Sequence, residues 1–376
     1  MSFFTVHHRS KKSKARVGTI QTSHGLIQTP TFVPCATKGT LKGIPPEMIP
    51  NMQVQLMFVN TYHLVTHPGT NIIKDAGGIH TYSKLPTPLM SDSGGFQVFS
   101  LGKTTRRQSK LRGDSEEEPL LVKISEDGVK FRSVHDGQLV EFSPETSMQF
   151  QREIGADLVM AFDECTYLDA THDYARKSMI RTHDWLDRCI SYGVNEHQHL
   201  YGIIQGGQFE DLRKESARFI SSRDVDGVAI GGVSVGETKE AMREQVRWCS
   251  EFLPAEKPVH LLGVGHIDDL KDLISYGIDT FDCVEPTRIA RIGQIYQWNG
   301  DRTEPIDIQK SIYRNSQEPI DANCDCWSCR SFSKSYLHHL FKQRELLGYT
   351  IATFHNVYTI ERYVATLREQ ILRGVI

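Results

Sequence analysis

The sequence predicts a (β/α)8 barrel, a TIM barrel of the α/β class. Eight short runs of aliphatic and β-branched residues recur along the chain, and each ends in a polar or glycine-bearing turn. They occupy residues 29–35, 54–60, 87–95, 156–164, 200–207, 227–236, 258–265 and 278–286. Their hydrophobicity is continuous rather than alternating, which is typical of strands buried on both faces of a parallel sheet. Helix-like stretches lie between many of them, as a barrel requires.

An open, doubly wound sheet is the alternative architecture. It is disfavoured because no glycine-rich phosphate motif follows the first predicted strand.

Two helices have clear ends. Ser143 and Pro144 predict an N-cap and a first helical position for residues 143–155, and Gly193 predicts the end of an amphipathic helix over 174–193.

Three segments stand outside the strand–helix alternation. Residues 123–142 alternate around two Asp-Gly pairs, which predicts an inserted antiparallel meander. Residues 103–119 hold five basic and then four acidic residues, and we expect a mobile loop there. Residues 16–33 predict a hairpin that turns at Ser23-His24-Gly25 and covers the closed end of the barrel.

The composition is that of an ordinary globular enzyme. The 376 residues are 39% hydrophobic and 24% charged, with a formal net charge of −3. A polyanionic partner would therefore need a local basic patch. No stretch approaches the ~20 apolar residues that cross a bilayer, and the first residues lack the apolar core of a secretion signal, so we expect a cytoplasmic protein. We expect one barrel domain over 1–376, with a subdomain at 300–360 that lies against it.

Polar residues follow several predicted strands. They are Asp92, Asp163, Gln205, Gly231, Gly232 and Asp282. In a barrel the carboxyl ends of the strands form the active-site face. A group of carboxylates is costly there unless it serves chemistry, and one acid as nucleophile with a second as acid/base suits cleavage of a glycosidic bond. The alternative for any single acid is a helix N-cap or a salt-bridge partner.

Cys324, Cys326 and Cys329 lie within six residues. In a reducing compartment such crowding predicts a metal site rather than disulfides. His355 is the expected fourth ligand, with His338 and His339 as competitors that we assign instead to a solvated helix face. Four protein ligands leave no open position, so the expected Zn²⁺ is structural.

Motifs spread along nearly the whole chain resemble bacterial tRNA-guanine transglycosylase. They are NTYHL with HPG (60–69), SDSGGFQVFSL (91–101), AFDEC (161–165), GIIQGG (202–207), IGGVSVGE (230–237), LLGVGHIDDL (261–270), FDCVEPTRIARIG (281–293), and CDCWSCR with FHNVY (354–358). The resemblance implies a barrel with a zinc subdomain. It also implies exchange of the wobble guanine of GUN-anticodon tRNAs for a 7-substituted 7-deazaguanine, a step toward queuosine, and a homodimer.

The resemblance also implies roles for particular residues. Asp282 would be the nucleophile that holds tRNA as a covalent glycosyl-enzyme, and Asp92 would be the general acid/base. The residues that bind the base would be Asp92, Ser93, Gly94, Gly95, Phe96, Asp163, Cys165, Gln205, Gly231, Gly232, Val233, Val235 and Leu262. The residues that contact tRNA would be Gly263, Val264, Gly265, His266, Ile267, Asp268, Asp269, Thr287, Arg288, Ile289, Ala290 and Arg291. For the two arginines, salt bridges within the barrel are the alternative role.

The choice of incoming base stays open between 7-aminomethyl-7-deazaguanine and queuine. Cys165 and Val235 follow the bacterial pattern, which goes with the former. Leu262 and Glu285 depart from that pattern beside the expected base pocket, as Ile289 and Cys35 do elsewhere. Other functions also compete: a non-catalytic tRNA-binding subunit, an archaeosine-type enzyme and a hydrolase of free nucleosides. Asp92 and Asp282 are both present, which favours the transglycosylase.

Overall fold

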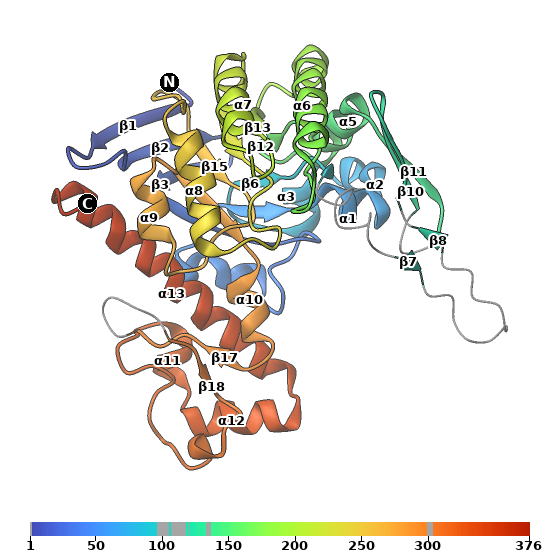
Figure 1. Cartoon of the computed structure of the whole chain (residues 1–376). Helices are drawn as coiled ribbons and strands as arrows, with labels where there is room; N and C mark the ends of the chain where they lie inside the picture. The colour runs from blue at the N-terminus through green and yellow to red at the C-terminus, as the bar shows by residue number, and fades with distance from the viewer. Residues whose placement is uncertain (1, 96–104, 107–117, 120, 133–136, 299–303) are drawn as a thin grey trace. The chain divides into compact units, whose positions relative to one another are not determined.

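The computed structural model describes residues 2–95, 105–106, 118–119, 121–132, 137–298 and 304–376 (Figure 1). The chain divides into two compact units. The first unit comprises Met1–Phe58, Ser83–Leu89 and His260–Ile376, and the second comprises Val59–Tyr82 and Met90–Val259. Phe96 and most of the loop 103–119 lie outside the described residues. Within the described part of the chain, no helix is long and apolar enough to cross a membrane.

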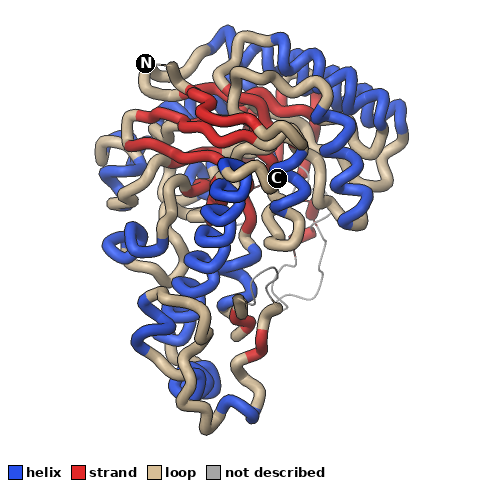
Figure 2. Tube along the Cα trace, turned by 90° about the vertical axis from the view of Figure 1, so that its left-hand side faces the viewer, coloured by secondary structure: helices blue, strands red, loops and turns tan. Residues whose placement is uncertain are grey.

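Eight strands form a single sheet that is nearly closed into a barrel. They are β4 (Thr31–Pro34), β5 (Met57–Val59), β6 (Leu89–Ser91), β12 (Leu158–Met160), β13 (His199–Ile204), β14 (Gly227–Ile230), β15 (Val259–Leu261) and β16 (Thr280–Cys283). Their order is β4-β16-β15-β14-β13-β12-β6-β5, and an isolated parallel bridge between Cys35 and Phe58 joins the first strand to the last. Figure 2 draws strands in red with helices in blue beside them. The predicted (β/α)8 barrel is confirmed, and the doubly wound alternative is wrong.

Nearly every strand residue is buried, as continuous hydrophobicity predicts. The helices that alternate with the strands are α1 (Thr61–Thr66), α2 (Thr70–Asp75), α3 (Ile79–Ser83), α5 (Pro144–Ile154), α6 (His172–Tyr192), α7 (Glu210–Ser222), α8 (Lys239–Ser250), α9 (Leu270–Ser275) and α10 (Glu285–Ala290), with the 3₁₀ helix η1 (Pro46–Met52) before β5. Ser143 caps α5 through a reciprocal bond pair with Thr146, and Gly193 ends α6. Both predicted helix ends are confirmed.

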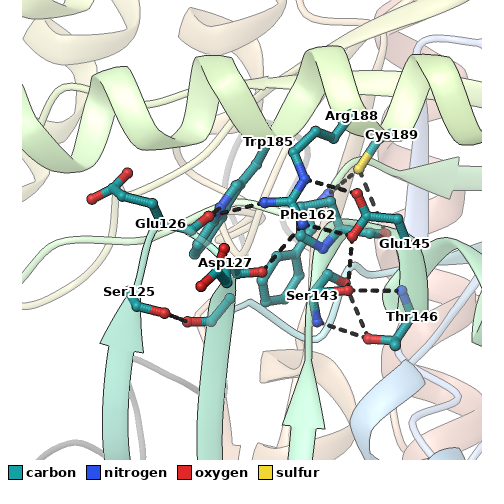
Figure 3. Close-up of polar contacts among 12 residues, drawn as sticks. Ser125, Glu126, Asp127, Ser143, Glu145, Thr146, Phe162, Trp185, Arg188 and Cys189 are labelled. Carbon is teal, nitrogen blue, oxygen red and sulfur yellow. Dashed lines mark hydrogen bonds and ion pairs between the residues drawn. The ribbon is translucent and has the colours of Figure 1, made fainter.

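The predicted meander lies in the second unit. It consists of β9 (Leu121–Ser125), β10 (Gly128–Arg132) and β11 (Leu139–Phe142), all antiparallel. Its β9–β10 turn is fixed to α6, because the Glu126 carbonyl accepts hydrogen bonds from Trp185 Nε1 at 2.7 Å and Arg188 Nη1 at 2.9 Å (Figure 3). Ahead of the meander, β7 (Thr105–Arg106) pairs with β8 (Glu118–Pro119) inside the predicted loop.

The first unit begins with a three-stranded antiparallel sheet of β1 (Phe4–Arg9), β2 (Arg16–Thr22) and β3 (Gly25–Thr29). The turn between β2 and β3 lies at Ser23-His24, as predicted. Arg16 forms a buried two-bond ion pair with Asp279, at 2.6 and 2.9 Å, directly before β16 begins. The pair fixes this sheet to the amino end of a barrel strand.

The C-terminal part of the first unit follows α10. Its elements are β17 (Gln294–Ile295), β18 (Ile306–Asp307), η2 (Ser311–Tyr313), α11 (Trp327–Ser331), α12 (Lys334–Gln343) and α13 (Leu346–Leu372). Ser333 caps α12, and Arg344 ends it with a left-handed conformation at φ 57°. The chain reverses there, so that α13 returns His355 to the cysteine cluster.

Candidate active site and metal centre

In the second unit, Asp163 follows β12 and is the centre of a buried polar group. Its Oδ1 accepts a hydrogen bond from the Ser93 hydroxyl and its Oδ2 accepts one from Gln205 Nε2, both at 2.8 Å. Only 5% of the residue is exposed. Burial raises the pKa of Asp163 to about 6, although the bonds from Gln205 and Ser93 oppose that rise. The structure thus brings three predicted base-binding residues together.

The side-chain amide of Gln205 can accept a further hydrogen bond beside Asp163. Its Oε1 is buried and has no hydrogen-bond partner among the described residues. Gly232 lies against that oxygen with φ +64°, and a Cβ atom on Gly232 would come within 2.3 Å of it. A Cβ on Gly95 would come within 2.3 Å of the Asp163 carbonyl. Both glycines are therefore needed for close approach, and an unpaired amide oxygen is available to a donor on a ligand.

Arg213 of α7 supports the glycine turns after β13 and β14. The side chain is fully buried, and it donates to the carbonyls of Gly207, Gly231 and Gly232 at 2.8, 2.6 and 2.7 Å. It also donates to Gln245 Oε1 at 3.1 Å. Burial lowers the pKa of the Arg213 guanidinium. This residue fixes Gly231 and Gly232, and the sequence interpretation missed it because an arginine in an amphipathic helix ordinarily faces water.

Asp92 follows β6, and its carboxylate is bonded to the start of α1. Oδ1 accepts a hydrogen bond from the Thr61 backbone N–H at 2.6 Å, and Oδ2 accepts one from Asn60 Nδ2. The Thr61 hydroxyl donates to the Asp92 carbonyl at 2.6 Å, while Asn60 caps α1 through His63 N–H. The carboxylate is half-buried and oriented by the Asn60-Thr61 pair. Because the carboxylate lies at the start of α1, it also fits the alternative role of a residue that stabilises a helix N-terminus.

The remaining predicted base-binding residues described in this unit lie in the segments that follow its strands. Gly94 has φ +83°, and Cys165 and Val233 are buried. Burial raises the pKa of the Cys165 thiol, so it stays neutral. The backbone N–H of Val235 donates to Glu237 Oε2 at 2.8 Å, which fixes the turn after Val233.

In the first unit, Asp282 lies in β16 and is 8% exposed. Its Oδ1 accepts a hydrogen bond from the Gly263 backbone N–H at 2.7 Å and lies 3.2 Å from His260 Nε2. Its Oδ2 lies 3.7 Å from Cys35 Sγ, a weak donor. The structure therefore fixes one carboxylate oxygen through two nitrogen donors.

The predicted tRNA-contacting loop, residues 263–269, connects β15 to α9. Leu262 is half-buried at its start, and Val264, Gly265, Ile267 and Asp269 are buried while Gly263 and Asp268 are exposed. His266 Nε2 lies 3.6 Å from Glu285 Oε1, and His266 Nδ1 lies 3.7 Å from Asp268 Oδ2. Glu285, which we expected to depart from the family pattern, thus contacts this loop.

The second predicted tRNA segment is α10, which carries Thr287, Arg288, Ile289 and Ala290, with Arg291 as its C-cap. Arg291 donates to the Thr287 carbonyl at 2.8 Å. Among the residues described, neither arginine pairs with a carboxylate, so the alternative of salt bridges within the barrel finds no support. Burial, and then the charges of Arg291, Lys38 and Arg288, lower the pKa of Lys42. Four cationic side chains therefore gather here.

The cysteine cluster meets α13 as predicted. The ligand atoms of Cys324, Cys326, Cys329 and His355 all lie within 4.8 Å of one another. Cys326 and Cys329 Sγ lie 3.6 and 3.2 Å from His355 Nδ1, and His355 Nε2 donates to the Tyr296 carbonyl at 2.8 Å. That bond places the proton on Nε2 and leaves Nδ1 to face the sulfur atoms. Three thiolates and one imidazole form a group that can hold a metal ion.

His355 is therefore the histidine of the cluster, and the two competitors differ. His339 is exposed and stacks with Tyr336, as expected for a solvated helix face. For His338 that expectation is wrong, because it is 7% exposed and its Nδ1 donates to the Ile308 carbonyl at 2.8 Å. It faces the interior of the subdomain because α12 is amphipathic and His338 follows Leu337 on its buried side.

The fold and these residues define an α/β-barrel protein with carboxylates at its strand ends and a C-terminal Cys3His group. Residues 10–376 match the family model described as queuine tRNA-ribosyltransferase. A protein of that name from Roseiflexus sp. (strain RS-1) is 40% identical over 385 residues, which covers 99% of this chain and 96% of the relative. One from Herpetosiphon aurantiacus is 42% identical over 373 residues, covering 99% and 90%. One from Staphylococcus aureus (strain JH9) is 42% identical over 362 residues, covering 96% and 90%.

The chain belongs to the queuine tRNA-ribosyltransferase family. The predicted family and the predicted enzyme class, a pentosyltransferase, are confirmed. The sequence interpretation did not single out His260, Arg213 or the Asn60-Thr61 pair, although each of them orients a predicted site residue. Their only signal was proximity to the matched motifs, since Asn60 and Thr61 open NTYHL and His260 directly precedes LLGVG.

Proposed function

We propose that the protein exchanges the wobble guanine of GUN-anticodon tRNAs for a 7-substituted 7-deazaguanine through a covalent intermediate on Asp282. The observation that carries the proposal is the Asp282 carboxylate. Its Oδ1 is bound by the Gly263 N–H, and among the described residues its Oδ2 lies beside only a weak thiol donor. Family membership supplies the substrate class, since the relatives are named for ribosyl transfer to tRNA. An oriented, nearly buried carboxylate is suited to nucleophilic attack.

In the proposed reaction, an oxygen of Asp282 forms a bond to the ribose anomeric carbon as the bond from that carbon to guanine N9 breaks. The electron pair of the broken bond leaves with guanine, which takes a proton from the protonated form of Asp92. The incoming base then loses a proton to Asp92 and displaces the carboxylate. Two inversions give net retention and ping-pong kinetics.

Asp163 and Gln205 would recognise the base. An ionised Asp163 accepts hydrogen bonds, and Gln205 Oε1 accepts another, which suits the N–H groups on the edge of a guanine-like ring. A pKa of about 6 leaves Asp163 mainly ionised at neutral pH. Ser93, Gly94, Gly95, Phe96, Cys165, Gly231, Gly232, Val233, Val235 and Leu262 complete the proposed base-binding set.

We propose 7-aminomethyl-7-deazaguanine rather than queuine as the incoming base, on the evidence of Cys165 and Val235. Glu285 adds an acid that would favour a cationic amine substituent, which both candidate bases carry. Loop residues 263–269 and α10 would grip the anticodon loop, with Arg288 and Arg291 on phosphates. The exchanged nucleotide must leave its stack for this contact.

The metal is proposed to be Zn²⁺ in a structural role. The donor set fits, since soft thiolates and a neutral imidazole suit tetrahedral Zn²⁺ and leave no open position for chemistry. We expect one zinc atom per chain by elemental analysis. Chelation should lower the free energy of unfolding by several kcal/mol, and Cys324→Ser should lose the metal. Loss of turnover with an unchanged unfolding transition would contradict the structural role.

A homodimer is also proposed. The C-terminal part of the first unit exposes apolar side chains, with Ile312 72% and Leu346 79% exposed. Phe332 and Tyr336 add a pair of stacked aromatic rings whose centroids lie 5.6 Å apart. Such surfaces are typical of protein contacts. Sedimentation at several protein concentrations would show a dimer, and Leu346→Glu should shift it toward monomer.

The test of the proposed function is a parallel exchange assay. Unmodified GUN-anticodon tRNA is incubated with the protein and with labelled guanine, 7-aminomethyl-7-deazaguanine or queuine, and the wobble nucleoside is identified by mass spectrometry. Incorporation of the aminomethyl base in preference to queuine is expected. Binding of tRNA without any incorporation would instead indicate a non-catalytic subunit.

A further inference from the structure

His260 lies next to the Asp282 carboxylate and is completely buried. It is part of β15, and its ring stacks on Phe58 with centroids 5.8 Å apart and planes 15° apart. Its two ring nitrogens have different partners on the neighbouring strand β16. Nε2 lies 3.2 Å from Asp282 Oδ1 and Nδ1 lies 2.8 Å from Thr280 Oγ1. The ring is therefore fixed by stacking and by two hydrogen bonds.

The chemistry of the partners determines where the imidazole proton lies. An ionised Asp282 only accepts hydrogen bonds, so Nε2 must carry a proton. In the neutral imidazole Nδ1 then accepts, and the Thr280 hydroxyl donates to it. Hydrogen bonds thus run from Thr280 to His260 and from His260 to Asp282 Oδ1. The Thr280 hydroxyl pairs with the tautomer in which His260 gives Asp282 a second donor besides the Gly263 N–H.

We infer that His260 is a positioning residue that gives the two Asp282 oxygens different roles: one is anchored and the other forms the bond to ribose. Oδ1 is anchored by His260 and Gly263, while Oδ2 has only the Cys35 thiol at 3.7 Å among the described residues. Oδ2 is then the atom that attacks. This inference rests on the proposed function, because it assigns the atom of Asp282 that forms the glycosyl ester.

The anchoring has a different effect on each half of the reaction. In the first half, the Oδ2 electron pair forms the bond to the anomeric carbon, and the bond to guanine N9 breaks with its pair. Oδ1 becomes the ester carbonyl. In the second half the ester bond breaks, its pair returns to the carboxylate, and the incoming base takes the anomeric carbon. The His260 donor binds the carboxylate more strongly than the ester carbonyl, so it favours departure of Asp282 over its attack.

Removal of this donor should therefore shift the equilibrium toward the covalent adduct. The protein is incubated with tRNA and increasing guanine, and the denaturation-resistant protein–tRNA adduct is measured. The readout is the guanine concentration that halves the adduct, because this value does not depend on the fraction of protein that is active. His260→Phe keeps the ring but loses the donor, and we expect about fivefold more guanine to be needed, which corresponds to about 1 kcal/mol.

His260→Gln provides the conservative control, since its amide N–H can reach the place of Nε2, and it should stay within about twofold of wild type. Thr280→Val should shift the midpoint in the same direction as His260→Phe, and it serves if the latter does not fold. His183→Phe replaces another buried histidine, which bonds Ser216 at 3.1 Å on α7, and it should leave the midpoint unchanged.

An unchanged midpoint in both His260→Phe and Thr280→Val would overturn the inference while the proposed function stands. Equal shifts in His260→Phe and His260→Gln would also overturn it, because the effect would then come from packing. If the wild-type protein forms no adduct, the covalent mechanism and this inference fail together, and the exchange assay decides what remains of the proposed function.

Discussion

Asp163 and Asp282 are both buried aspartates at barrel strand ends, one in each unit, yet their neighbours give them different capacities. Asp163 accepts one side-chain hydrogen bond on each oxygen, and both donors are neutral. Asp282 has two nitrogen donors near a single oxygen, which leaves the other to a thiol. The distribution of donors, rather than burial, separates a carboxylate suited to recognise a ligand from one suited to form a bond.

The largest expected effect is that of Asp282→Asn. An amide is a poor nucleophile, so exchange should fall by about 10⁴-fold or more and the denaturation-resistant adduct should disappear. Binding of tRNA should persist, because Asn keeps the size and the Gly263 contact. Exchange kinetics, adduct gels and tRNA binding are measured on the same preparation.

Asp163→Asn is the matched comparison for that experiment. It should weaken binding of the base and raise its KM, yet still form an adduct with tRNA. An adduct that survives in Asp282→Asn and vanishes in Asp163→Asn would reverse the roles assigned to the two residues.

The difference between the two aspartates could not be predicted from sequence, although their positions could. Continuous apolar runs predict the barrel strands, and strand ends predict where Asp163 and Asp282 lie. The Cys3His group that could hold a metal ion was predicted because its three cysteines lie within six residues, so local spacing restricts their geometry. The donors near Asp282 come from residues 35, 260 and 263, and those near Asp163 come from residues 93 and 205. Such contacts depend on the register of distant strands, which no local pattern encodes.

Arg213→Met tests whether base recognition by Asp163 and Gln205 depends on the glycine turns that Arg213 holds. The substitution leaves the carbonyls of Gly207, Gly231 and Gly232 without their buried donor, so the free energy of unfolding should fall by about 3 kcal/mol. Exchange should fall about 10- to 100-fold through KM for the base, since the turn beside Gln205 moves. Urea unfolding and steady-state kinetics check both values.

This pattern is the inverse of that expected for Asp282→Asn, which stops chemistry and leaves stability nearly unchanged. Arg213→Lys retains a donor and should fall between Arg213→Met and wild type. Unchanged stability in Arg213→Met would mean that water or movement of the backbone replaces the lost bonds.

The raised pKa of Asp163 predicts how stability depends on pH. Burial raises this pKa from its usual 3.8 to about 6, so the folded protein binds the proton more tightly than the unfolded chain. The resulting stabilisation is complete below pH 3.8 and is lost as pH rises through about 6, and it amounts to about 3 kcal/mol. Asp163→Asn lacks this term, so its stability relative to wild type should rise by most of that amount between pH 4 and pH 7. Urea unfolding of both proteins at each pH measures it, because the other titrating groups cancel in the difference.

The smallest expected effect is that of Glu126→Ala in the meander turn. The Glu126 side chain is 73% exposed and pairs with Arg181 at 2.7 Å, whereas its carbonyl holds the bonds from Trp185 and Arg188 that fix the turn (Figure 3). Alanine keeps the carbonyl, and an exposed ion pair contributes only about 0.5 kcal/mol. Arg181 also pairs at 2.5 Å with the buried Glu164, whose charge helps to raise the pKa of Asp163, and that pair should persist. Thermal unfolding and exchange should therefore stay close to wild type, whereas a tenfold loss of exchange would show that the meander influences Asp163 and that the recognition side extends to this turn.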